Sequence, residues 1–227
     1  ADAEASIAKA VDLSASASPT LKAQALSAAA RTALKGGTGK AAVDMATKAV
    51  AAEKSAHSLG TLAAAHARQG DAKAAHAAAD AAIAAGATSS VAHAGKGDAL
   101  TLSGQTAEAV ASYRKAVELD PKNTSAQVGL AYALILSNKA TEAKAIALKA
   151  TEQDKNSGAA FAALGFAISA EKNFNGADAS WTEAISQAQQ GAFLAPRDPQ
   201  VQVVVAKLFE ARGNLDQAQV AYENAIK

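Results

Sequence analysis

The residues of this chain that could do chemistry are four histidines and a scattered set of carboxylates. The histidines are His57, His66, His76 and His93, and no two of them are spaced i,i+4. That spacing puts two ligands on one face of a helix and would indicate a metal site. The absence of cysteine from the sequence excludes disulfides, thiolate metal sites and a cysteine nucleophile. We therefore expect no bound metal and no cofactor.

Other catalytic patterns are missing as well. The stretch GGTGK at 36–40 is glycine-rich, but it lacks the spacing of a phosphate-binding loop and no strand precedes it. Carboxylates such as Asp98, Glu108 and Glu183 stand at positions typical of solvated helix surface, and no pair forms a general acid–base site. No motif brings a serine to a histidine and an aspartate. The sequence predicts a protein that is not an enzyme.

The charge and composition of the chain exclude further classes of protein. With Lys+Arg 22 and Asp+Glu 21, the net charge is +1, so nucleic acid is not the expected partner. No apolar run reaches about 18 residues, so no direct membrane span is predicted. Alanine makes up about 29% of the chain and aromatic residues only 4%. Because alanine is the best helix former and fills little space, we expect an all-helical protein with closely packed backbones.

The elements that must position any functional residue repeat along the chain. A shift of about 34 residues aligns small residues of the sequence in three sets. One further copy of the repeat follows after a longer gap. A weaker copy lies upstream and aligns only when its register is moved by one residue. The three sets are Ala63, Gly97, Ala131 and Gly165; Ala75, Ala109, Ala143 and Ala177; and Ala82, Ala116, Ala150 and Ala184. Small residues in phase let paired helices approach closely, so each repeat is predicted to be a helical pair.

The segment 90–123 carries Gly97, Leu100, Ala109, Tyr113 and Pro121 at the spacing of a known repeat. In these residues the chain resembles the tetratricopeptide repeat (TPR) family, over about 22–227. It departs from the family pattern at the tryptophan and first leucine positions, which hold His93 and Lys96. The resemblance implies an all-α fold, an α-solenoid forming a right-handed superhelix of about six repeats plus one N-terminal helix.

We expect an N-terminal helix and loop over 1–21 and a TPR array over 22–227. The repeats are predicted at 22–55, 56–89, 90–123, 124–157, 158–198 and 199–227. Asp120–Pro121 and Asp198–Pro199 suit helix starts, because Asp can cap free N–H groups and Pro fits the first turn.

The fifth repeat carries seven extra residues, which predict a longer second helix broken near Gly191 and Pro196. This insertion is either a tolerated surface feature or a lip on the binding groove, with Phe193 and Leu194 as contacts.

The resemblance implies that first helices line the concave side, where extended segments of partner proteins bind. One inward row is predicted at Ala30, Ala64, Asp98, Tyr132, Phe166 and Lys207, and a neighbouring row at Thr101, Ile135, Ser169 and Glu210. Tyrosine and phenylalanine suit binding anchors because they offer large contact area with few rotors. The alternative is that Tyr132 and Phe166 only pack between adjacent repeats.

These observations predict a non-catalytic scaffold that binds a protein or peptide partner in its groove. Two alternatives remain: self-assembly into a homo-oligomer through uncapped terminal helices, and a regulatory module of a larger enzyme. The opening ADAEAS suits either a mature form after signal cleavage or a trimmed chain. Alanine-rich TPR chains of this style resemble bacterial periplasmic or lipoprotein factors for pilus, envelope or exopolysaccharide assembly. We expect a periplasmic or envelope location in a bacterium, with a cytoplasmic one as the alternative.

Bulky side chains are distributed unevenly. All aromatic residues lie between Tyr113 and Tyr222, and the first third of the chain has few large apolar residues beside its alanines. Burial of apolar surface stabilises by about 25 cal/mol per Å², so small side chains contribute less. We therefore expect residues 1–89 to open at a lower free energy than the rest.

Overall fold

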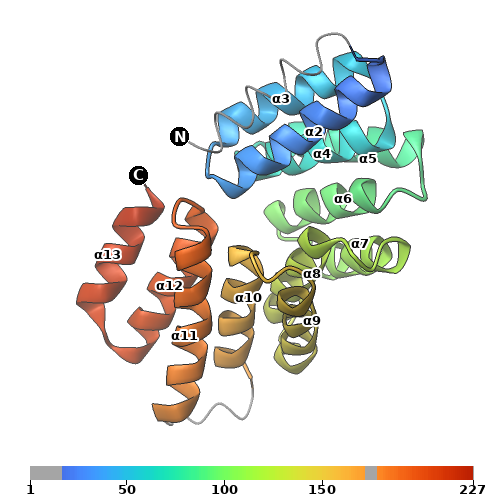
Figure 1. The fold of residues 1–227 in the computed structure, drawn as a ribbon. Helices are drawn as coiled ribbons and strands as arrows, with labels where there is room; N and C mark the ends of the chain where they lie inside the picture. Colours follow the sequence, from blue (N-terminus) through green and yellow to red (C-terminus); the bar gives the residue numbers. More distant parts are fainter. Residues whose placement is uncertain (1–16, 172–177, 227) are drawn as a thin grey trace. The chain divides into compact units, whose positions relative to one another are not determined.

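The computed structural model describes residues 17–171 and 178–226, and within them it contains twelve helices, α2 to α13, and no strand (Figure 1). The all-α repeat architecture expected from the sequence is confirmed. The helix predicted in the first part of the 1–21 segment, over 1–13, lies outside the described residues. The chain divides into two compact units, one ending at Ala126 and the other beginning at Gln127. None of the described helices is both long and apolar enough to cross a membrane.

Unit 1 consists of three helical pairs. Its helices are α2 (Pro19–Lys35), α3 (Gly39–Ala52), α4 (Ala56–Arg68), α5 (Ala72–Ala85), α6 (Ser90–Leu102) and α7 (Thr106–Leu119). In each pair the first helix packs against the second, and the first helices α2, α4 and α6 pack against one another in order (Figure 1). The α2–α3 pair is held by a cluster of small side chains, which includes Ala30, Ala33, Ala42, Ala46 and Ala65.

Unit 2 begins within α8 (Thr124–Leu136), which contains the boundary between the units. Its other helices are α9 (Ala140–Gln153), α10 (Gly158–Ser169), α11 (Asp178–Leu194), α12 (Pro199–Arg212) and α13 (Leu215–Ala225). Here α10 packs against both α11 and α12, and α12 packs against α13. The core cluster of this unit holds larger side chains than that of α2–α3, among them Val201, Val204, Leu208 and Phe209.

Helix starts follow local chemistry, with one error in the prediction. Asp198 caps α12 as expected, since its carboxylate accepts the N–H of Gln200 at 3.0 Å and Pro199 occupies the first turn. The same prediction for Asp120–Pro121 is wrong. Asp120 instead follows the end of α7, and its carboxylate accepts the N–H of Lys122 at 3.0 Å in a turn. Asn123 supplies the oxygen that accepts from Ala126 at 3.1 Å in the first turn of α8.

Close backbone approach explains the small residues of the repeat. A side-chain carbon added to Gly97 would come within 2.7 Å of Cε1 of Tyr113. One added to Gly60 would come within 2.6 Å of the carbonyl oxygen of Val91 at the start of α6. Both distances are shorter than van der Waals contact. A larger residue at Gly60 would therefore require a shift of the α6 backbone, and one at Gly97 a shift of the Tyr113 ring.

The long helix of the fifth repeat is present, but its predicted break at Gly191 is wrong. α11 continues through Gly191 to Leu194 and ends before Pro196. An added side-chain carbon at Gly191 would lie 2.6 Å from the carbonyl oxygen of Gly158 on α10. This glycine therefore serves close packing of two helices, and the helix ends where proline cannot continue it.

Candidate partner-binding site

The row of first-helix residues predicted to bind a partner is wrong by one residue at its first position, which lies on α2 in unit 1. The step from the end of α2 to the end of α4 is one residue shorter than the step from the end of α4 to the end of α6. The residue of α2 that corresponds to Ala64 and Asp98 is therefore Arg31. Ala30 is fully buried among the small side chains of α2–α3, so its predicted place in the row is wrong. We call Arg31, Ala64 and Asp98 of unit 1, with Tyr132, Phe166 and Lys207 of unit 2, the first-helix row.

Asp98 is tied to the second helix of its own repeat. The hydroxyl of Tyr113 on α7 donates a hydrogen bond of 2.6 Å to Oδ1 of Asp98 on α6. Burial raises the pKa of Asp98 to about 6, opposed by the hydrogen bond from Tyr113 and by the charge of Arg68. At pH 7 the carboxyl is therefore mostly ionised. Because one oxygen is engaged by Tyr113, the carboxylate is a fixed acceptor rather than a free surface charge.

Thr101, one turn after Asp98, is also occupied within its helix. Its hydroxyl donates to the carbonyl oxygen of Gly97 at 2.8 Å, and its side chain is half-buried. Burial is also the largest cause that raises the pKa of the Tyr113 hydroxyl, followed by the charge of Asp98. No residue spacing in the sequence connects Tyr113 with Asp98. The only signal in the sequence is Gly97, which leaves the space that the Tyr113 ring fills.

Arg31, which the predicted row did not include, contacts His57. Its Nη1 lies 2.7 Å from Nε2 of His57 in the first turn of α4. Both side chains are half-buried. Burial lowers the pKa of Arg31, and burial followed by the charge of Arg31 lowers the pKa of His57. Since a guanidinium can only donate, His57 accepts as a neutral imidazole.

In unit 2 the first-helix row carries an aromatic pair. The rings of Tyr132 on α8 and Phe166 on α10 have centroids 6.3 Å apart and planes tilted by 46°. Both rings are partly buried and pack against the core cluster that includes Val201 and Val204 of α12. Part of each side chain remains accessible, as does part of Ile135, one turn after Tyr132. The aromatic pair thus combines a packing role with an accessible surface.

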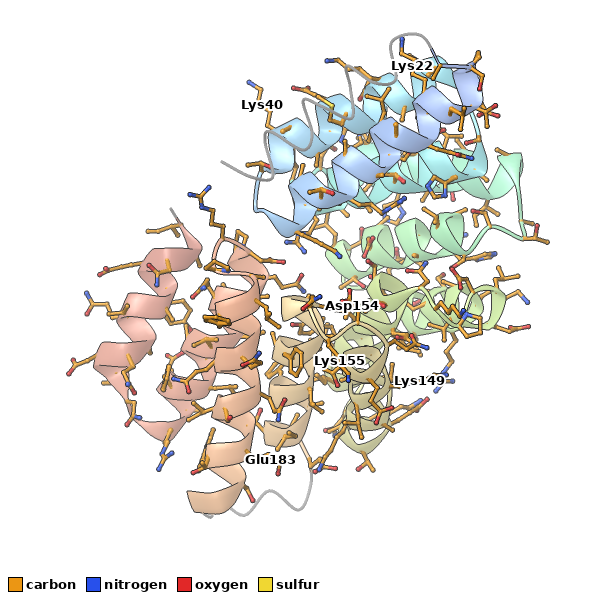
Figure 2. The ribbon with its side chains drawn as sticks, viewed as in Figure 1. Lys22, Lys40, Lys149, Asp154, Lys155 and Glu183 are labelled. Atoms are coloured by element: carbon orange, nitrogen blue, oxygen red, sulfur yellow. The ribbon has the colours of Figure 1, made fainter. Side chains whose placement is uncertain are left out.

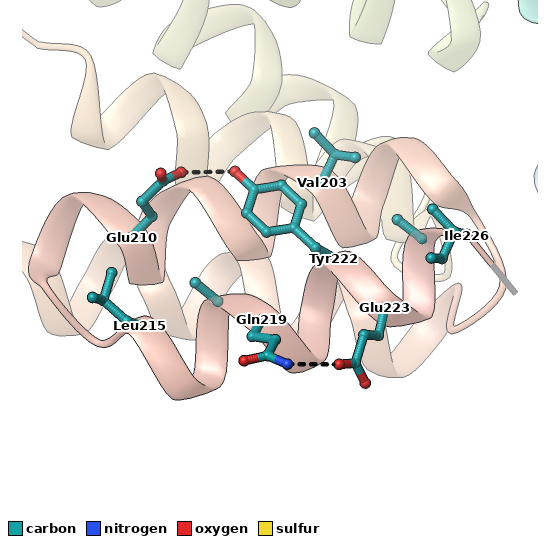
Figure 3. Close-up of a pocket in the computed structure, with 9 residues that line it drawn as sticks. Val203, Glu210, Leu215, Gln219, Tyr222, Glu223 and Ile226 are labelled. Atoms are coloured by element: carbon teal, nitrogen blue, oxygen red, sulfur yellow. Dashed lines mark hydrogen bonds between the residues drawn. The ribbon is translucent and has the colours of Figure 1, made fainter.

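The remaining predicted contacts lie on α11 and α12. Lys207 and Glu210 are exposed on α12. Glu210 is not isolated, because the hydroxyl of Tyr222 on α13 donates to its Oε2 at 2.7 Å (Figure 3). Phe193, which we predicted as part of a groove lip, is 79% exposed, and Leu194 is half-buried. The groove lip formed by these two side chains stays a prediction.

A shallow groove of about 430 Å³ lies on the side of the last helical pair. Its lining combines apolar and acidic side chains of α12 and α13, including Val203, Glu210, Leu215, Tyr222 and Ile226 (Figure 3). Ile226 is 87% exposed, whereas Ile185, its counterpart on α11 in the preceding pair, is 8% exposed within the core cluster. The last pair therefore presents a stacking surface that α12 covers on the preceding pair.

No group of three metal-ligating side chains gathers anywhere in the parts of the chain that the structure describes, 17–171 and 178–226. The four histidines are dispersed over α4, α5 and α6. His76 lies 2.7 Å from the hydroxyl of Ser103, and His93 lies 2.8 Å from the carbonyl oxygen of Ala87. These contacts are those of individual surface side chains.

Comparisons with known proteins agree with the repeat. Two family models described as tetratricopeptide repeat match residues 61–124 and 100–165. No curated protein matches the sequence.

Among solved structures, the thermophilic TPR protein TTC0263 of Thermus thermophilus is 15% identical with a TM-score of 0.63, over 83% of this chain and 99% of that one. PilF of Pseudomonas aeruginosa is 16% identical with a TM-score of 0.55, over 88% of each chain. A chain of the APC/C hetero-tetramer Cut9–Hcn1 is 14% identical with a TM-score of 0.71, over 89% of this chain and 38% of that one. At these identities the likeness concerns the fold.

Proposed function

The chain belongs to the tetratricopeptide repeat family, and we propose that it is a non-catalytic scaffold that binds a segment of a partner protein on the first-helix residues of unit 2. The observation that carries the proposal is the partly accessible aromatic pair Tyr132–Phe166, on two first helices in phase with the repeat. Rigid aromatic side chains dominate the energetics of many protein interfaces, because they bury large areas and lose few rotamers.

The aromatic pair Tyr132–Phe166 is suited to this role because the side chains beneath it hold it in place. Both rings pack against the core cluster of unit 2, which fixes their positions before any partner arrives. An anchor that is already ordered loses less conformational entropy on binding. Lys207, exposed at the next position of the row, supplies a positive charge beside the apolar surface. A partner segment with an apolar side chain followed by an acidic one fits this part of the row.

The test compares capture of partner proteins by the full chain and by variants. Replacement of Tyr132 and Phe166 by alanine removes the aromatic pair, and the matched control replaces Leu136 and Leu148, which are 61% and 47% exposed on α8 and α9. We expect the first variant to lose at least about tenfold in affinity for a captured partner, as for hot-spot side chains, and the control to lose little. Equal capture by both variants would reject the row as the site.

Loss of the aromatic pair also removes packing, at a cost of about 3 kcal/mol or more in stability. Lys207→Glu is therefore measured in parallel, because an exposed charge reversal leaves the fold intact. A photo-crosslinking residue introduced at position 207 identifies the partner directly. Crosslinks from position 207 and none from position 148 support the row.

We also propose a role in bacterial envelope, pilus or exopolysaccharide assembly, in a periplasmic or envelope-associated location. The support is the style of the sequence, namely its alanine-rich repeats, together with the likeness of fold to PilF. Fractionation of cells that express the gene at its natural level tests the location. Recovery in the cytoplasm alone would contradict this part of the proposal.

A second candidate function is self-assembly, which the exposed stacking surface of α12–α13 favours. Leu215 is 65% and Ile226 is 87% exposed there, and apolar surface of this kind commonly marks an interface. If copies of the chain associate through it, light scattering will give a mass that rises with concentration, and Ile226→Glu will reduce it to the monomer. A mass independent of concentration would exclude this candidate.

A further inference from the structure

The first helices of the first two repeats have a charge that differs from that of the whole chain. α2 and α4 together carry four cationic side chains and no carboxylate, while the complete chain has a net charge of only +1. The four are Lys22, Arg31, Lys35 and Arg68. This part of unit 1 therefore presents a locally positive surface, which attracts an anionic ligand.

Within this surface, Arg31 is a cation whose charge is not balanced by its hydrogen-bond partner. Its guanidinium is half-buried, and its hydrogen-bond partner is the neutral imidazole of His57, 2.7 Å away. An uncharged acceptor does not balance a cation that is partly withdrawn from water. Among residues 17–171 and 178–226, no carboxylate lies within ion-pair distance of Arg31. A carboxylate supplied by a ligand would complete the site.

The geometry suits a carboxylate. A guanidinium has five N–H donors in a plane and His57 takes one of them, so a pair remains for the two oxygens of an acid. One turn before Arg31, the hydroxyl of Ser27 is buried and has no hydrogen-bond partner among the described residues. One turn after Arg31, the carbonyl oxygen of Leu34 lies 3.5 Å from Nη2 of Arg68, which brings a second guanidinium to the same edge of α2.

The neighbouring face of α4 presents a small side chain between two polar ones. His57, Ala64 and Arg68 are spaced seven and four residues apart, which places them on one side of a helix. Ala64, between the two polar residues, is half-buried and small. A main chain can therefore lie against Ala64 while its side chains reach Arg31 and His57.

We propose that Arg31 and His57 form a binding site for the carboxylate of a glutamate or aspartate in an acidic segment of a partner protein. Arg31 binds the carboxylate through paired hydrogen bonds. Arg68, whose charge also acts on Asp98, contributes a second guanidinium at the same edge of α2. The proposal rests on the proposed function in taking a protein segment as the ligand. It places that ligand in unit 1, on residues that do not include the aromatic pair Tyr132–Phe166.

The test uses a defined probe, the blocked peptide acetyl-Ala-Glu-Ala-Glu-Ala-amide, and the same peptide with glutamine in place of glutamate. Binding to the full chain is followed through the ring carbon–proton resonances of His57 by NMR at pH 7.5 and low salt. We expect the glutamate peptide to shift these resonances in a saturable manner and the glutamine peptide to leave them unchanged. Equal shifts with both peptides would overturn the proposal.

Variants locate the effect. Arg31→Gln is expected to weaken binding at least about tenfold, the effect of losing a charge-assisted pair of hydrogen bonds. The matched control is Lys22→Gln, which removes the same charge from the same helix; Lys22 projects away from the ribbon of α2 (Figure 2). We expect it to weaken binding less than about threefold, because Lys22 lies nine residues from Arg31 along the helix, more than two turns away. Equal losses in the two variants would mean general electrostatic attraction and would overturn the proposal.

Further measurements ensure that the test of the Arg31–His57 site gives a clear result. Should Arg31→Gln fail to fold, Arg31→Lys retains the charge without the planar pair of donors, and it must then bind more weakly than Lys22→Gln. A short oligothymidylate that shifts His57 more strongly than the glutamate peptide would assign the site to nucleic acid instead. The Tyr132→Ala/Phe166→Ala variant must bind the probe as the parent chain does, so failure at either site is recognised separately.

Discussion

The hydroxyl of Tyr113 reaches from the second helix of its repeat to the first and donates a 2.6 Å hydrogen bond to Oδ1 of Asp98. This contact is possible because Gly97, beside Asp98, has no side chain and the Tyr113 ring occupies that space. One small residue thus couples helix packing to the placement of a carboxylate on the first-helix row. The contact gives the chain a polar link inside a repeat whose other buried residues are mainly alanine and glycine.

Removal of the Tyr113 hydroxyl should destabilise the protein and raise the pKa of Asp98 further. A partly buried carboxylate that loses its hydrogen bond costs about 1.5–3 kcal/mol. Tyr113→Phe is compared with Tyr222→Phe, which removes the exposed hydrogen bond to Glu210 and should cost less than about 0.5 kcal/mol. Urea unfolding measures the stability, and NMR titration of the Asp98 carboxyl measures its pKa. Equal losses in the two variants would contradict this account.

The stability of the protein should depend on pH through Asp98. Its pKa is raised from 3.8 to about 6 in the folded chain, so the folded state binds a proton more tightly than the unfolded state does. This contribution is therefore fully present below pH 3.8 and is lost as the pH rises to about 6. His57, whose pKa is lowered from 6.5, acts in the opposite direction, because its contribution is lost as the pH falls below 6.5.

Comparison with Asp98→Asn isolates the Asp98 contribution, since the variant keeps His57. The amide can still accept from Tyr113 and has no charge to desolvate, so we expect the variant to be at least as stable as the parent chain at pH 7. Between pH 4 and pH 7, the free energy of unfolding of the variant should fall less steeply with rising pH than that of the parent chain, or rise more steeply. Parallel curves for the two proteins would show that Asp98 does not titrate in this range.

Gly97→Ala should destabilise the chain even though alanine favours a helix by about 1 kcal/mol over glycine. The new methyl group would lie 2.7 Å from the Tyr113 ring, which must then move away from Asp98. We expect a net loss of about 1–3 kcal/mol, the usual cost of overpacking. Gly36→Ala is the control, because its added carbon would meet ordinary contacts at 3.6 and 3.7 Å. Thermal unfolding distinguishes the two, and an unchanged midpoint for Gly97→Ala would contradict the prediction.

Amide hydrogen exchange should be faster in α2 to α5 than in α10 to α12. The cluster around α2 and α3 is made of alanines such as Ala30, Ala42 and Ala46, whereas the cluster of unit 2 includes Leu208 and Phe209. Larger buried side chains contribute more apolar area and hold their helices against local opening. Mass spectrometry of exchanged peptides provides the measurement. Protection that is uniform over these helices would refute the expectation.

Most of the correct predictions came from the periodicity of the sequence. Small residues recur once in every repeat because paired helices must approach closely at the same level each time, and this pattern is visible without coordinates. Gly97 and Gly165 are examples, and the structure finds both buried. Candidate binding residues were harder to place, because a register that slips by one residue moves the row position from the buried Ala30 to the half-buried Arg31.

The sequence by itself determined the helical class, the repeat and the small residues at its contacts, since these depend on local propensity and on a spacing that recurs. Only the tertiary structure decided which side chains meet. The pairs Arg31–His57 and Tyr113–Asp98 join residues from different helices. Gly191 lies within a continuous helix because a neighbouring helix requires the space, although its residue type alone favours a break. Such contacts depend on how helices approach one another, and no residue type or spacing within a single helix specifies that approach.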